Sequence, residues 1–202
     1  MNPTMSSFIF LLSLALSFLI CPDPTTAAVT PAQEISASLN ELIAQACSST
    51  PNKDLCHQTI NADNKTPKND INDLAFITFE AASIKTVANI EYITRSSEDP
   101  EIGQAGDAGK SSLKQVFDDC EQQYEGAMDD VDNSVNYLAS RTKDDDKQIH
   151  GLLKDAVSSI EACQKNLEGK GPKTEQLIKL NQEALDLLNN ALGVFHVIYK
   201  QK

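Results

Sequence analysis

The sequence has no tryptophan, only three methionines, and aromatic residues at 5% of its 202 positions. It also lacks any stretch in which polar and apolar residues alternate between turn signals, and it contains no internal repeat. These absences argue against a β-sandwich, a β-barrel and a repeat protein. The remaining composition, 41% hydrophobic and 23% charged, is typical of one globular helical domain. A chain of this length can fold on its own.

Basic residues are in the minority, with 17 lysines and arginines against 29 acidic residues and a formal net charge of −12. Such a chain repels polyanions, so nucleic acid is disfavoured as a partner. A basic protein surface would instead be attracted, and its encounter with the chain would be accelerated.

Motifs that carry chemistry are also missing. No CxxC pair or tight Cys/His cluster indicates zinc, and Gly103, Gly106 and Gly109 follow no strand that would make them a nucleotide fingerprint. The three histidines are scattered over different segments, without a nearby nucleophile motif. The acids 144–146 could suggest a cation site, but such a run is more typical of a solvated helix start. We therefore predict no enzyme activity, no metal and no cofactor.

One apolar run stands near the N-terminus. Phe8–Cys21 spans 14 residues, fewer than the roughly 20 needed to cross a bilayer. Small residues follow it up to Ala28, as in a secretory cleavage region. We predict a signal peptide over 1–28, cleaved after Ala28, and a secreted domain over 29–202 that has no membrane segment after cleavage.

The chain is organised around two long helical patterns between Ser111 and Leu167. Their apolar residues recur at steps of three and four, which places each set on one helix face. The polar stretch Ser140–Asp146 between them suits a turn, so a helical hairpin is predicted. The two stripes are Leu113, Val116, Cys120, Tyr124, Ala127, Val131, Ser134 and Leu138, then Ile149, Leu153, Ala156, Ile160, Cys163 and Leu167.

Four cysteines remain after signal cleavage, an even number that predicts two disulfides in a secreted chain. Cys120 and Cys163 are about equally far from the predicted bend, because helices rise about 1.5 Å per residue. They would therefore meet side by side. That pairing leaves Cys47 with Cys56, which flank a turn-rich break.

Other segments complete the bundle. Helices are predicted at 33–46, 55–60 and 71–95, and a regular pattern ends the chain from Leu177 to Ile198. Four long helices with short loops favour antiparallel neighbours. We predict an all-α fold: an up-down-up-down four-helix bundle at about 70–200, preceded by an N-terminal helical hairpin at about 33–62. The predicted core stripe of the 71–95 helix is Leu74, Ile77, Ala81, Ile84 and Ala88, widened by Val87, Ile90 and Ile93.

These residues together resemble the plant pectin methylesterase inhibitor and invertase inhibitor family. The resemblance covers about Ile35–Ile198. It rests on Cys47 and Cys56 around SSTPNKDL, on the segment LKQVFDDCEQQYEGAMDDVDNSVNYL, and on GLLKDAVSSIEACQKNL before a final amphipathic helix. It implies disulfides between the first and second and between the third and fourth cysteines, as the spacing also indicates.

The resemblance further implies a secreted, apoplastic protein of the cell wall that inhibits an enzyme in a one-to-one complex and is otherwise a monomer. One branch of the family covers the substrate cleft of pectin methylesterase. The other inhibits acid invertase, in the cell wall or vacuole, through a Pro-Lys-Phe motif between the two central bundle helices. The corresponding loop here, 141–148, reads RTKDDDKQ without that motif. Pectin methylesterase inhibition is therefore the first interpretation, invertase inhibition the alternative, and a non-inhibitory, ligand-binding or allergen-like bundle a further alternative.

Two surface features complete the prediction. The sequon at Asn64 predicts an N-linked glycan. Partner contacts are expected on the helix after Ser111, at positions opposite its core stripe, and they should make binding depend on pH. The predicted contacts are Asp118, Gln122, Asp129 and Asn133.

Overall fold

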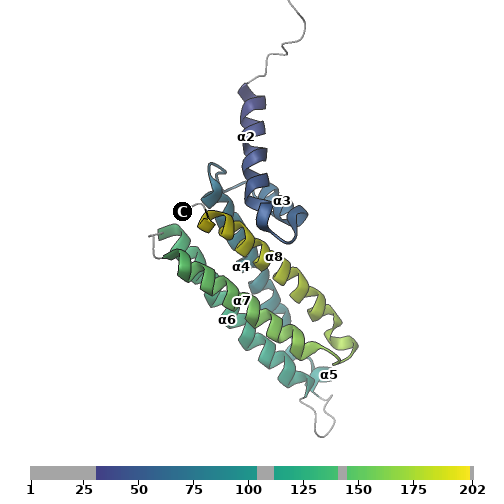
Figure 1. Cartoon of the computed structure of the whole chain (residues 1–202). Coiled ribbons are helices and arrows are strands. Elements are labelled where there is room, and N and C mark those ends of the chain that lie inside the picture. The colour runs from purple at the N-terminus through teal and green to yellow at the C-terminus, as the bar shows by residue number, and fades with distance from the viewer. Residues whose placement is uncertain (1–30, 104–111, 141–144, 201–202) are drawn as a thin grey trace, which may run out of the picture. The chain divides into compact units, whose positions relative to one another are not determined.

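The structure, a computed structural model, describes the backbone of residues 31–103, 112–140 and 145–200 (Figure 1). The chain divides into a unit of residues 1–36 and a unit of residues 37–202, and the second holds the fold. Within the described ranges the secondary structure consists of helices and turns, without a strand. The all-α prediction is confirmed. The predicted signal peptide and its cleavage site lie outside the described residues.

A helical hairpin comes first. It contains α2 (Pro31–Ala46), a 3-10 turn (Cys47–Ser49) and α3 (Lys53–Ala62). Asn52 caps α3, because its side-chain Oδ1 accepts a hydrogen bond of 3.1 Å from the Leu55 N–H. A disulfide joins Cys47 to Cys56 across the turn.

Four long helices follow, and in Figure 1 each runs back alongside the one before it, as the up-down-up-down prediction requires. Asp70 starts the first of them, accepting hydrogen bonds of 2.8 and 3.0 Å from the Asn72 and Asp73 N–H groups. A short helix, α5 (Pro100–Gly103), follows the first long helix in a stretch that we predicted only as a break. The four are α4 (Ile71–Ser97), α6 (Leu113–Ser140), α7 (Asp145–Leu167) and α8 (Glu175–Lys200).

The predicted stripes of α6 and α7 are confirmed, since every residue in both is buried. Cys120 and Cys163 lie on these stripes and are joined by the second disulfide, with their Cα atoms 4.8 Å apart. Both predicted disulfides are therefore present, one in the hairpin and one in the bundle.

The predicted stripe of α4 is wrong over its middle part. Ile84 is 69% exposed and Val87 is 39% exposed, and Ala88 is exposed as well. Polar side chains occupy the buried face instead, and they satisfy their own hydrogen bonds: the Thr86 Oγ1 donates to the Ala82 carbonyl at 2.9 Å. Counting apolar residues could not find such a face. Its buried residues are Leu74, Ala75, Ile77, Thr78, Phe79, Ala82, Thr86, Asn89, Ile93 and Ser97.

The predicted turn before α7 also needs correction. Asp145 and Asp146 already belong to the first turn of α7, and Gln148 of the predicted 141–148 loop is helical too. Asp146 is only 4% exposed, so it is not part of a solvated helix start. Residues 141–144 lie outside the described part.

The core of the bundle forms two clusters. The disulfide half surrounds Cys120–Cys163 and includes Ile93, Tyr124 and Leu177. The hairpin half surrounds Cys47–Cys56 and holds the buried rings of Phe79 and Phe195, as well as buried residues of α2 and α3. Its buried residues are Ile43, Ala46, Cys47, Cys56, Ile60, Leu74, Ala75, Ile77, Phe79, Leu138, Ile149, Leu153, Ala191, Val194, Phe195 and Ile198.

The hairpin turn lies against α8 at Gly193. A Cβ atom at this glycine would stand 2.8 Å from the Thr50 Cα and 2.9 Å from the Ser49 carbonyl oxygen. Real Cβ atoms do not approach backbone so closely, so the missing side chain permits this packing. Next to it, the Asn190 Nδ2 donates to the Asn52 carbonyl at 2.9 Å. Together these contacts hold the turn on the bundle.

Candidate functional site

The four predicted contact residues share the solvent-facing side of α6. Gln122, Asp129 and Asn133 are exposed, and the Asp118 side chain is 39% exposed. Asp118 pairs with Lys114 one turn earlier, with Nζ to Oδ1 at 2.7 Å. Because the buried stripe occupies the opposite side of the helix, these four side chains are available to a partner. We refer to them as the α6 face.

A shallow hollow of about 410 Å³ lies between α6 and α7 at the end of the α6 face. Sequence reasoning missed it, because a hollow between two helices depends on side-chain volumes on both of them. Its lining includes one predicted contact residue, Asn133, and a half-buried tyrosine. The lining residues are Asn133, Tyr137, Gln148, Gly151, Leu152 and Asp155.

Acids crowd together beside this hollow. Burial raises the pKa of the Asp130 carboxyl, and the nearby charges of Asp155 and then Asp129 raise it further. Like charges on α6 and α7 thus disfavour full ionisation here. A cationic group placed beside these acids would relieve that repulsion.

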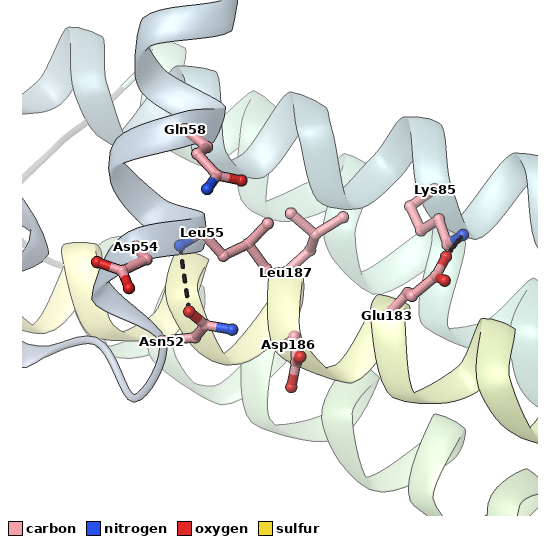
Figure 2. Close-up of a pocket in the computed structure, with 8 residues that line it drawn as sticks. All are labelled: Asn52, Asp54, Leu55, Gln58, Lys85, Glu183, Asp186 and Leu187. Atoms are coloured by element: carbon pink, nitrogen blue, oxygen red, sulfur yellow. Dashed lines mark hydrogen bonds and ion pairs between the residues drawn. The ribbon is translucent and has the colours of Figure 1, made fainter.

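A second groove, of about 440 Å³, lies where α3 meets α4 and α8 (Figure 2). Leu55 from α3 and Leu187 from α8 point toward each other in its middle, as the figure shows. Polar and charged groups surround them. We call this the α3–α4–α8 groove, and its lining residues are Asn52, Asp54, Leu55, Gln58, Lys85, Glu183, Asp186 and Leu187.

At one end of the groove an ion pair joins two of the long helices. The Lys85 Nζ of α4 donates to the Glu183 carboxylate of α8 at 2.5 Å (Figure 2). This hydrogen bond is the main reason why the pKa of Glu183 lies below its ordinary value. No sequence motif marks the groove, since its residues come from three segments that only the fold brings together.

His150 of α7 packs against α8. The rings of His150 and Tyr199 stack with centroids 6.2 Å apart. Burial lowers the pKa of His150, and the charges of Lys154 and then His196 lower it further, so His150 and His196 are neighbours in space. Across the described ranges no three His, Cys, Asp or Glu side chains are grouped to hold a metal ion.

Two further observations concern the predicted secretion. Asn64 is exposed in the connector between α3 and α4. In the part of the chain that the structure describes, no helix is both long enough and apolar enough to cross a membrane.

The described residues form a four-helix bundle with a disulfide-linked N-terminal hairpin, and its outer faces carry charged groups and two shallow hollows. The family follows from comparison with known sequences. The chain belongs to the plant invertase/pectin methylesterase inhibitor family, whose model matches residues 41–194.

Solved structures agree with this assignment at the level of the fold. A mutant form of a pectin methylesterase inhibitor from Arabidopsis is similar with a TM-score of 0.60 and 16% identity, covering 76% of this chain and 95% of that one. A pectin methylesterase inhibitor from Arabidopsis thaliana gives a TM-score of 0.54 and 15% identity, covering 77% and 95%. No curated protein matches the sequence.

Proposed function

We propose that this chain is a secreted inhibitor of pectin methylesterase that works by covering the enzyme's substrate cleft in a one-to-one complex. The match to the inhibitor family over residues 41–194 carries the proposal. The family name gives two target enzymes, invertase and pectin methylesterase, and the sequence has no recognised catalytic motif of its own. The sequence RTKDDDKQ at 141–148 favours pectin methylesterase over acid invertase, since it lacks Pro-Lys-Phe.

The proposed contact surface is the α6 face. Its four side chains project from a rigid helix that is cross-linked to α7 through Cys120 and Cys163, so little conformational entropy is lost on binding. Its acids, of which Asp118 is already paired with Lys114, would attract a basic surface on the enzyme and accelerate the encounter. We expect the affinity to depend on pH between about pH 4 and about pH 8, because the charges of the two surfaces change over this range, and a flat binding titration would contradict this.

The proposed setting is the apoplast. A signal peptide at 1–28, two disulfides and a glycan at Asn64 fit secretion into an oxidising compartment. The domain proposed for that compartment is 29–202.

Residual activity of two enzymes tests the target. Purified protein is mixed in molar excess with a plant pectin methylesterase and, separately, with an acid invertase. We expect loss of pectin methylesterase activity and unchanged invertase activity. Inhibition of invertase alone would transfer the assignment to the other branch, and inhibition of neither would favour a non-inhibitory bundle.

A pair of matched variants tests the α6 face. Asp118→Asn/Asp129→Asn removes two charges from it, and we expect the inhibition constant to rise about tenfold. Glu98→Gln/Glu168→Gln removes two charges from exposed positions elsewhere, and it should inhibit like the wild type. Equal inhibition by both variants would place the contact surface on another face.

A further inference from the structure

We propose that the α3–α4–α8 groove is a docking site for a lysine- or arginine-bearing segment of a basic partner protein. The groove uses none of the residues of the α6 face. The proposal is therefore independent of the enzyme contact proposed for the α6 face.

The charge of the groove identifies the sign of the occupant. Among the described residues that line it, three are carboxylates and one is an ammonium. Lys85 and Glu183 neutralise each other across 2.5 Å, which leaves the charges of Asp54 and Asp186. The Gln182 Nε2 donates to the Asp186 carboxylate at 3.0 Å, but a neutral amide does not cancel that charge. A cation is the complementary ligand.

The floor of the groove identifies the shape of the occupant. Leu55 and Leu187 are half-buried, so each keeps apolar surface that water contacts. Lysine and arginine carry a charged head on an aliphatic stem, and the stem can cover apolar surface while the head stays in a polar environment. One such side chain could cover the two leucines while its head reaches Asp54 or Asp186.

A second hollow favours a peptide segment over a free polyamine. It measures about 270 Å³, lies between α3 and α4, and is lined by Ile77, Ala81 and Ile84 among others. Ile84 adjoins Lys85 in sequence and is 69% exposed, more than the other exposed large hydrophobic residues of the described part, Val87 and Tyr199. Ile84 lines this hollow and Lys85 lines the groove, so a segment with an apolar residue beside its basic one could reach both. A polyamine has no apolar side chain to place there.

A second copy of the chain is a poor occupant. Each copy carries a formal charge of −12, and the groove of one molecule would meet an acidic surface of the other. The two uncompensated acids of the groove therefore favour a basic partner.

The probe is an amidated, acetylated hexapeptide of alternating lysine and leucine, titrated into the full chain and followed by calorimetry. We expect binding to the wild type, and a loss of about tenfold or more in affinity for Asp54→Asn/Asp186→Asn. Glu98→Gln/Glu168→Gln changes the net charge equally at exposed positions outside the groove and should bind like the wild type. Helical circular dichroism and the unfolding temperature verify that both variants are folded.

Several results would overturn the proposal. A peptide that fails to bind the wild type leaves the groove without its occupant. Equal losses in the two variants would show attraction to overall charge alone. Spermidine binding as tightly as the peptide, with the same dependence on Asp54 and Asp186, would reassign the groove to free polyamines. Because no enzyme is present, failure here leaves the proposed inhibition untouched.

Discussion

The core of the disulfide half encloses a polar network around Tyr124, whereas at the centre of the hairpin half two phenylalanine rings pack against each other. In the first, the Asn89 Nδ2 donates to the Tyr124 hydroxyl at 2.9 Å, and that hydroxyl also bonds the Asn181 amide at 2.7 Å. Burial raises the pKa of Tyr124, which keeps the phenol protonated. In the second, the rings of Phe79 and Phe195 lie 6.1 Å apart.

The difference shows two ways of fixing one bundle. Directional hydrogen bonds specify how α4, α6 and α8 meet in the disulfide half, because a buried amide without its partner is costly. In the hairpin half, apolar packing and the close approach at Gly193 bring the turn against α8, and the hydrogen bonds between Asn190 and Asn52 fix its position at the edge of that packing. Mutations in the disulfide half should therefore destabilise the fold by leaving buried polar groups without partners. Mutations in the hairpin half should destabilise it by leaving cavities.

The largest expected effect comes from the aromatic core. Phe79→Ala leaves a cavity and should lower the free energy of unfolding by about 3–5 kcal/mol. Tyr124→Phe keeps the ring and removes only the hydroxyl, so about 1–3 kcal/mol is expected. Urea unfolding followed by circular dichroism measures both. A greater loss for Tyr124→Phe would reverse the comparison between the halves.

Removal of the disulfides should have the next largest effect on stability, and the two should differ in size. Cys120 and Cys163 are 43 residues apart, and Cys47 and Cys56 are 9 apart. Loop-closure entropy then predicts losses of about 4 kcal/mol for Cys120→Ala/Cys163→Ala and about 2.5 kcal/mol for Cys47→Ala/Cys56→Ala. Denaturant midpoints of the two double variants measure the difference. Equal losses in the free energy of unfolding would mean that native-state contacts, and not the entropy of the unfolded chain, decide the effect of each disulfide.

Close packing at the hairpin turn predicts a smaller loss. Gly193→Ala should destabilise the protein by about 1–3 kcal/mol, because the new methyl group collides with the backbone at Thr50 and Ser49. Gly126→Ala is the matched control, since nothing lies within 4 Å of its added Cβ and a helical alanine is favoured over glycine. A Gly193→Ala protein as stable as the wild type would show that the turn is not fixed against α8.

The smallest expected effects depend on pH and have opposite signs. The pKa of Glu183 is lowered, so its ion pair stabilises the fold above the ordinary pKa and is lost as the pH falls through the lowered value. The pKa of Asp130 is raised, so its charge destabilises the fold as the pH rises through that value. At neutral pH, Glu183→Gln should lower the free energy of unfolding by a few tenths of a kcal/mol, and Asp130→Asn should raise it by a similar amount. Unfolding at neutral pH and at about pH 3 checks the signs, and differences that persist unchanged in acid would contradict them.

The fold was accessible from sequence wherever apolar spacing decided burial. Every predicted stripe residue of α6 and α7 is buried, and the mirror positions of Cys120 and Cys163 correspond to a disulfide in the structure. The same method failed for the middle of α4. There Thr86 and Asn89 are buried with their hydrogen bonds satisfied, while Ile84 faces solvent. A search for apolar spacing assigns the apolar face of a helix to the core. It therefore gives the wrong face where polar residues are buried and apolar residues are exposed.

The sequence predicted less of the candidate sites than of the fold. Helical spacing was enough to place Gln122, Asp129 and Asn133 on an exposed face of α6. The α3–α4–α8 groove needs residues more than a hundred positions apart, from Asn52 to Leu187, to meet in space. No local pattern encodes such a meeting. Whether the α6 face touches an enzyme is a question of binding and stays a prediction.

The most direct test of the proposed inhibition is a titration of a fixed amount of pectin methylesterase with the purified protein, followed through the release of pectin carboxyl groups. The account predicts a linear fall in activity that ends near one molecule of this protein per molecule of enzyme. Full enzyme activity at a large molar excess, measured with folded and disulfide-bonded protein, would contradict it.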